Sequence, residues 1–149
     1  DKLKNLLVNE GLFKELKEIR DLLNKAHSFV SANTQKIEDD YKQKLENLIN
    51  EKIVPENYAT RLQTEVIFLL EKKDVSEELK RIEYHVSNLK NLFKEDEVSM
   101  GRKLDFVAQE LNREWTTLGN KLQKTEIYPI IRDAKLTIEK IREQSLNLA

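Results

Sequence analysis

The sequence contains no cysteine, only three glycines and only two prolines among its 149 residues. Without cysteine the chain can form neither a disulfide framework nor a thiolate zinc site. The shortage of glycine and proline leaves few residues suited to the turns that connect strands. No apolar run approaches the ~18 residues that would suggest a membrane span. These absences exclude several protein classes and favour a cytoplasmic protein that is not inserted in a membrane.

Charged residues make up 36% of the chain and hydrophobic residues 39%. Leucine, lysine, glutamate, isoleucine and asparagine dominate, and this composition favours long helices. We expect an all-α fold of five to six helices, in which a long antiparallel helical hairpin packs with shorter helices. By its length the chain forms a single helical domain over residues 1–149.

Residues 1–53 are expected to form one long helix or a pair of helices. Helix-poor polar residues at 31–34 mark the place where two helices would divide. A heptad-like seam of this length suggests packing against partner helices. Its apolar positions, at steps of three and four, begin with Leu16, Ile19, Leu23, Ala26 and Val30.

Residues 54–149 carry the motifs. The stretch 59–70 is the most apolar of the chain and predicts a buried helix. A second helix is expected from Asp74 and a third over 101–121, where the sequence loosens at 119–124. A last helix starts at Thr125 or Tyr128, with Pro129 in its first turn.

The helix predicted over 101–121 has two different faces. Carboxylates, amides and arginines on its polar faces are the groups that a phosphate or metal site uses. An apolar stripe consists of Leu104, Val107, Ala108, Leu111, Trp115 and Leu118. The polar faces carry Arg102, Asp105, Gln109, Glu110, Asn112, Arg113 and Glu114.

The helix predicted from Asp74 places Glu77, Arg81 and His85 on one face at steps of four. Histidine can carry protons near neutral pH or bind a metal. Helix capping and solvated ion pairs explain the same residues equally simply. In the next helix, Glu110 and Glu114 repel each other unless a cation lies between them, so they could belong to a metal site. The alternative to a metal site is a salt-bridge network between subunits.

The net charge of −1 does not indicate nucleic-acid binding by itself. Its distribution is uneven, with 8 basic against 11 acidic residues over 51–97 and 9 against 7 over 98–149. An acidic region beside a basic one suits a site where carboxylates hold a cation and arginines hold phosphates. Random charge scatter on exposed helices is the alternative.

Three stretches together resemble the YicC/YloC family of bacterial proteins, in its C-terminal helical domain. They are KDVSEELKRIEYH at 73–85, GRKLDFVAQELNREWTTLGNK at 101–121 and IEKIREQSLN at 138–147. The resemblance implies the C-terminal half of a longer protein, and a metal-dependent endoribonuclease that uses Mg²⁺ or Mn²⁺ and no small-molecule cofactor. It also implies RNA as the partner and a homo-oligomer, a hexamer when full-length.

With the resemblance, the candidate residues take three roles. The candidate catalytic residues are His85, Glu78, Glu110 and Glu114. The candidate metal ligands are Asp74, Glu77, Asp105 and Glu110. The candidate RNA and phosphate contacts are Arg81, Lys121 and Arg142, together with Arg102, Lys103, Gln109 and Arg113.

Two alternatives to an enzyme remain open. The chain could be a non-catalytic oligomerisation and interaction module of the longer protein, inactive in isolation. It could also be a structural coiled-coil spacer, in which case the polar rows at 74–85 and 102–114 would point to solvent without converging.

Overall fold

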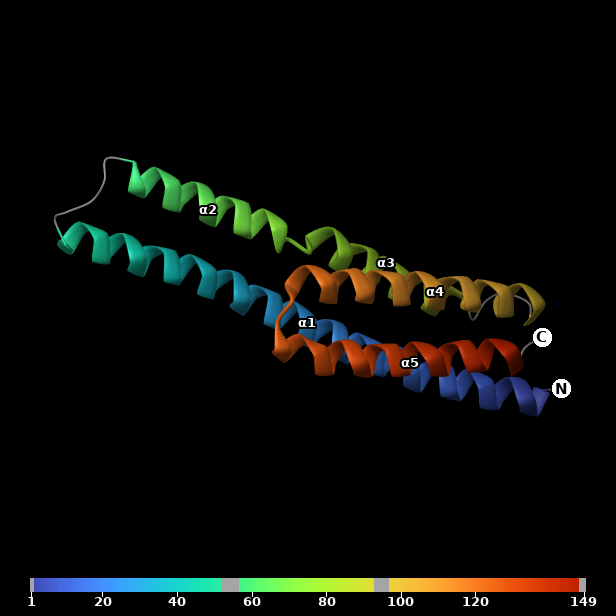
Figure 1. Ribbon diagram of the computed structural model, residues 1–149. Coiled ribbons are helices and arrows are strands. Elements are labelled where there is room, and N and C mark those ends of the chain that lie inside the picture. Colours follow the sequence, from blue (N-terminus) through green and yellow to red (C-terminus); the bar gives the residue numbers. More distant parts are fainter. Residues whose placement is uncertain (1, 52–56, 93–96, 148–149) are drawn as a thin grey trace. The chain divides into compact units, whose positions relative to one another are not determined.

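A computed structural model describes residues 2–51, 57–92 and 97–147 and is helical in all three ranges (Figure 1). The helices are α1 (Lys2–Glu51), α2 (Tyr58–Lys72), α3 (Ser76–Leu92), α4 (Glu97–Leu122) and α5 (Tyr128–Asn147), with a 3₁₀ turn, η1 (Thr125–Ile127), before α5. The described ranges contain no strand. The predicted all-α fold with long helices is confirmed.

Helix α1 continues through residues 31–34, so the polar stretch does not divide it. Each serine, asparagine or threonine there weakens a helix by only about 0.5 kcal/mol. Neighbouring side chains offset part of this, because Gln35 donates to Asp39 at 3.0 Å and Gln43 donates to Asn47 at 3.1 Å, four residues on. The N-terminal part of the chain is therefore one helix.

The chain divides into two compact units. The first unit comprises Asp1–His27 and Val75–Ala149, and the second comprises Ser28–Asp74. Helix α1 contributes to both, α2 lies in the second unit, and α3, α4 and α5 lie in the first. Every candidate site residue except Asp74 therefore belongs to the first unit.

In the first unit, α4 lies between α3 and α5 and contacts both. Neighbouring helices run antiparallel. Between Glu78 and Arg81 the chain advances along α3, while the partner on α4 moves back from Lys121 to Glu114. On the other side, Asp105 near the start of α4 contacts Arg142 near the end of α5. The predicted apolar stripe of α4 forms the centre of the core. Its six members, at most 5% exposed, are Leu104, Val107, Ala108, Leu111, Trp115 and Leu118.

Helix α4 ends where Gln123 adopts a left-handed conformation, with φ of 49°. The Gln123 N–H donates to the carbonyl oxygen of Gly119 at 3.0 Å, which satisfies one of the last helical carbonyls. The η1 turn then buries Ile127 completely, and Pro129 follows in the first turn of α5. The start of the last helix agrees with its sequence prediction.

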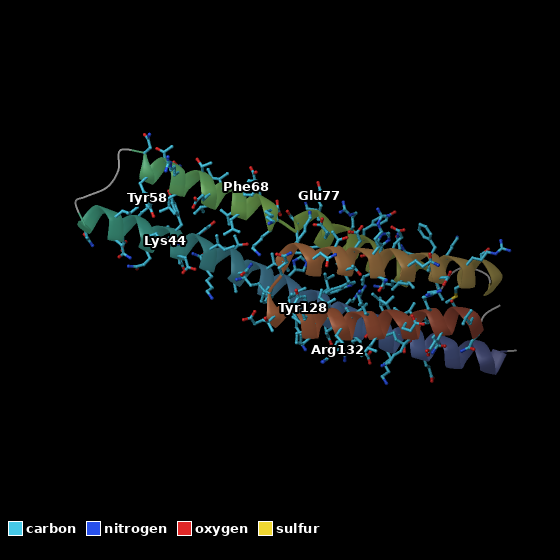
Figure 2. All side chains as sticks on the ribbon, viewed as in Figure 1. Lys44, Tyr58, Phe68, Glu77, Tyr128 and Arg132 are labelled. Atoms are coloured by element: carbon cyan, nitrogen blue, oxygen red, sulfur yellow. The ribbon has the colours of Figure 1, made fainter. Side chains whose placement is uncertain are left out.

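In the second unit, the apolar stretch of α2 is largely exposed, so its predicted burial is wrong. Only Leu62 is buried, whereas Ile67 is 50% exposed and Phe68, labelled in Figure 2, is 67% exposed. Consecutive helical residues point in directions about 100° apart, so an unbroken apolar run surrounds the helix. Packing on one side cannot cover such a run.

Within the described ranges, no helix combines the length and apolarity needed to cross a membrane.

The N-terminal part of α1 packs antiparallel to α5. Thr137 Oγ1 donates to Glu18 Oε2 at 3.4 Å, and Lys140 Nζ lies 3.8 Å from the same oxygen. Further along, a Cβ atom added at Gly11 would lie 2.6 Å from Gln144 Nε2. The amide end of the flexible Gln144 side chain therefore lies directly over Gly11.

Glu15 is a buried carboxyl group in the first unit. It is 6% exposed, and its Oε2 atom has no hydrogen-bond partner among the described residues. Burial raises the pKa of Glu15, and Glu18 and Glu143 raise it further, against Lys140 and Lys14, which lower it. Because its native pKa is raised, Glu15 contributes most to the free energy of unfolding at a pH below its unfolded pKa. This contribution is lost as the pH rises through the folded pKa.

Replacing Glu15 with glutamine is therefore expected to raise the free energy of unfolding at neutral pH by about 1 kcal/mol. The amide keeps the shape of the side chain and removes the buried charge. The gain should disappear at acidic pH, where the carboxyl group is protonated in both states. Urea unfolding at the two pH values measures it, with the exposed Glu10→Gln as control. An equal gain at both pH values would contradict the assignment.

Candidate functional site

The polar row of α3 lies on one helical face, as predicted, and Arg81 is its central member. Arg81 Nη1 lies 3.4 Å from Oε2 of Glu77, one turn earlier on α3. Arg81 Nη2 lies 3.5 Å from Oε1 of Glu78. On the neighbouring helix, Glu114 Oε1 accepts a hydrogen bond from Arg81 Nε at 2.9 Å. One guanidinium group therefore faces three carboxylates from two helices.

The carboxylates around Arg81 stabilise its charged form. The hydrogen bond to Glu114 raises the pKa of Arg81 above its ordinary value, and the bond to Glu77 and the charge of Glu78 add to the effect. All three guanidinium nitrogens approach these carboxylates, and Nε and Nη1 donate hydrogen bonds to them. The Arg81 side chain is 47% exposed, so an acceptor in solution can reach it.

A second ion pair joins α3 and α4 beside the first. Lys121 Nζ donates to Oε1 of Glu78 at 2.7 Å. The Glu78 side chain is only 3% exposed, whereas that of Lys121 is 39% exposed. The other carboxylate oxygen of Glu78, Oε2, is buried and has no hydrogen-bond partner in the ranges that the structure describes. Such an orphaned acceptor is uncommon in folded proteins and calls for a structural or functional explanation.

We call these five residues the α3–α4 cluster: Glu77, Glu78, Arg81, Glu114 and Lys121. Its three carboxylates and two cations give a formal charge of −1. Glu78 and Glu114 are buried, so they cannot contact a large ligand directly. They can hold Arg81 and Lys121 in fixed positions at the surface, as groups that bind phosphate require.

A separate polar group joins α4 and α5. Arg142 Nε donates to Asp105 Oδ1 at 3.1 Å, and Gln109 Nε2 donates to Asp105 Oδ2 at 2.9 Å. Both oxygens of Asp105 are therefore engaged by donors. The side chains of Asp105 and Arg142 are nearly half exposed, so this group lies at the surface.

His85 and Lys103 come together at the opposite end of the α3–α4 contact. Both line a hollow of about 280 Å³ between the C-terminal half of α3 and the N-terminal half of α4. The ring of Tyr84 stands edge-on to that of His85, with centroids 5.5 Å apart. His85 Nδ1 is buried, and no described residue forms a hydrogen bond with it. His85 lies one helical turn beyond Arg81, outside the α3–α4 cluster.

Three further candidate residues, all on α4, do not join these groups among the described contacts of the first unit. Arg102 and Arg113 are exposed on α4, and Glu110 is half-buried there. Asp74 belongs to the second unit and is exposed. Across residues 2–51, 57–92 and 97–147, no three His, Asp or Glu side chains meet as a metal would require. Of the predicted ligands, Glu77 and Asp105 each face an arginine, so the described carboxylates do not form a protein metal cage.

The sequence reasoning missed the aromatic and amide residues around His85. Tyr84 is 63% exposed and Phe106 is 61% exposed, and both line the hollow together with Asn88 and Asn91. The available signal was the position of Phe106, which lies outside the apolar stripe of its helix. A large aromatic residue on an otherwise polar face is a candidate for ligand contact.

The chain has recognisable relatives among known proteins. Residues 30–149 match the family model described as "Endoribonuclease YicC-like, C-terminal". A Clostridioides difficile protein named "Probable endoribonuclease YicC" is 36% identical over 155 residues, which cover 99% of this chain and 51% of the relative. A Haemophilus influenzae protein of the same name is 43% identical over 88 residues, or 59% of this chain and 30% of the relative. The chain spans at most about half the length of these curated relatives.

Proposed function

This chain belongs to the YicC-like endoribonuclease family, and from that membership we propose that it takes part in cleaving RNA phosphodiester bonds. The α3–α4 cluster is the observation that carries the proposal. Its buried carboxylates hold two partly exposed cations side by side. Cations fixed before the reaction stabilise the negative charge that develops on a phosphodiester, at little reorganisation cost.

In the proposed reaction, Arg81 and Lys121 bind the phosphate and stabilise the charge on its oxygens. Glu78 and Glu114 act through these cations, because their own carboxylates are too deeply buried to reach RNA. His85, one turn from Arg81 on the same helical face, is the proposed proton carrier. Arg102, Lys103, Gln109, Arg113 and Arg142 remain predicted contacts to the rest of the RNA backbone.

A divalent metal, Mg²⁺ or Mn²⁺, is part of the proposal because of the family resemblance. Mg²⁺ commonly keeps several waters and binds one or two carboxylates together with substrate phosphates. Glu110 suits this role best, because it is half-buried and pairs with no basic side chain in the described part of the chain. Since the described carboxylates do not form a complete site, we assign no step of the reaction to the metal.

The direct test is cleavage by the purified chain. We would incubate it with a structured RNA and Mn²⁺, with and without EDTA, and separate the products on a denaturing gel. The proposal expects products that require the metal and disappear with EDTA. If a longer protein containing this chain cuts RNA and the chain alone does not, the activity depends on another part of that protein. We place the protein in the cytoplasm as part of the same proposal.

The exposed apolar face of α2 favours a second candidate function, a helical oligomerisation and interaction module. Ile67, Phe68 and Leu69 are 50%, 67% and 37% exposed, and together they form a larger apolar surface than isolated exposed residues do. In this alternative the chain assembles copies of the protein, a hexamer when full-length, and does not cut RNA itself.

Replacing Phe68 with serine tests the alternative. If this face joins copies of the chain, the substitution should weaken self-association by about tenfold or more, because a buried phenylalanine anchor is lost. Sedimentation velocity over a concentration series measures the change, with Glu65→Gln, exposed on the same helix, as control. An unchanged distribution of species would remove this face from any assembly.

A further inference from the structure

The hollow beside His85 has the size and lining of a site for a single nucleobase. Its volume of about 280 Å³ lies just below the range of roughly 300–1,000 Å³ that is typical of sites for drug-sized ligands. The lining combines two exposed aromatic rings, Tyr84 and Phe106, with two amides, Asn88 and Asn91, and with Lys103. We propose that this hollow binds one unpaired base of a single-stranded RNA segment.

The two aromatic residues provide the surface for stacking. Tyr84 and Phe106 are 63% and 61% exposed although both carry large rings, and they come from different helices of the first unit. Bases of single-stranded RNA are commonly recognised by stacking on such rings, and every base has a face that can stack. The hollow therefore accepts a base that has left its own stack.

Polar groups in the hollow match the edges of a base. The amides of Asn88 and Asn91 each offer a donor and an acceptor, as base edges do. His85 Nδ1 is buried and has no partner within the described part of the chain, so a group bound in the hollow can satisfy it. Lys103 adds a positive charge at the rim, next to the phosphates that would flank the base.

The hollow and the α3–α4 cluster occupy one seam between the same two helices. Asn88 lies seven residues after Arg81 on α3, which corresponds to about 10 Å along the helix axis. A strand that places a base in the hollow can therefore direct a neighbouring phosphate toward Arg81. The identity of the ligand rests on the proposed function, whereas the existence of a base site can be tested without any cleavage.

The experiment compares two strands of equal length: a single-stranded RNA and the same ribose-phosphate strand without bases. Fluorescence anisotropy in EDTA measures their binding to the purified chain. Stacking of one base should make the RNA bind roughly 5- to 150-fold more tightly than the abasic strand. Tyr84→Ala and Phe106→Ala should reduce this preference, and Tyr84→Phe should retain it. Tyr128→Ala, which removes a 49% exposed ring on α5, is the matched control and should change nothing.

The outcomes separate this inference from the proposed function. Base-dependent binding that the two alanine variants abolish supports the inference, even if the chain does not cut RNA. Equal binding of both strands, unaltered binding by the variants, or no binding at all overturns it, while the cleavage assay judges the function independently. If the variants change only the sedimentation of the protein, the two rings form a contact between proteins, and the inference is wrong. Phe106→Leu replaces Phe106→Ala if the alanine variant loses helicity.

Discussion

Replacing Arg81 with methionine is expected to lower the free energy of unfolding, because the substitution leaves two buried carboxylates without this cation. Glu114 and Glu78, whose side chains are 9% and 3% exposed, would lose a cation that lies 2.9 Å and 3.5 Å away. The loss should be smaller than for a fully buried pair, because the Arg81 side chain is 47% exposed and water can reach the vacated position. Chemical denaturation followed by circular dichroism measures the loss.

A double variant distinguishes the loss of the ion pair from the loss of packing. Arg81→Met combined with Glu114→Met removes both charges, so it should be more stable than the sum of the two single effects predicts. Strict additivity would mean that the two groups are not coupled. Arg20→Met, exposed on α1, is the control and should change stability by less than about 0.5 kcal/mol.

A second substitution at Arg81 distinguishes an effect on stability from an effect on the proposed RNA cleavage. Arg81→Lys keeps a positive charge but cannot face three carboxylates and a phosphate at once, because lysine lacks the planar guanidinium. It should therefore stay closer to the wild-type stability while RNA cleavage falls by about 100-fold. Undiminished cleavage by the lysine variant would remove Arg81 from the reaction.

The other large effect is expected at Trp115, which is fully buried in the core of the first unit. Trp115→Ala should lower the free energy of unfolding by about 3–5 kcal/mol, because it removes a large ring and leaves a cavity. Trp115→Phe should cost much less, about 1 kcal/mol. The phenyl ring keeps much of the buried area, and the substitution removes an indole N–H that has no acceptor within residues 2–51, 57–92 and 97–147.

Circular dichroism in denaturant is the suitable measurement at this position, because Trp115 is the only tryptophan in the chain and its loss removes the fluorescence signal. Tyr128→Ala serves as the control for the loss of an exposed ring. If alanine and phenylalanine at position 115 cost the same, the cavity is not the source of the loss.

The helices and their buried faces could be predicted from the sequence because they depend on local geometry. The stripe from Leu104 to Leu118 follows the helical period, and all of it is buried. The period gives no information where apolar residues are consecutive, so the sequence predicts burial for Phe68 and Leu69 on α2, which are 67% and 37% exposed. Sequence spacing shows which side chains share a face, but it does not show whether another element packs on that face.

The candidate site shows the same limit. Glu77, Arg81 and His85 could be placed on one face of α3 from their spacing alone. The pairing of Glu78 with Lys121, 43 residues away, and of Arg81 with Glu114, 33 residues away, depends on how α3 and α4 are aligned. That alignment is set by core packing across the two helices, which no local pattern records. For the same reason the hollow beside His85 could not be foreseen.

The first unit is assembled from two stretches of chain that are separated by residues 28–74. Thr137 of α5 and Glu18 of α1, which are in contact, lie 119 residues apart. During synthesis, the N-terminal part of α1 emerges long before its partner exists, whereas α3, α4 and α5 follow one another directly. We therefore expect α3–α5 to associate first and α1 to dock afterwards, closing a loop whose entropy cost grows only slowly with its length. Until then, the apolar side of α1 has to stay in solution, which exposes this helix to aggregation while the chain folds.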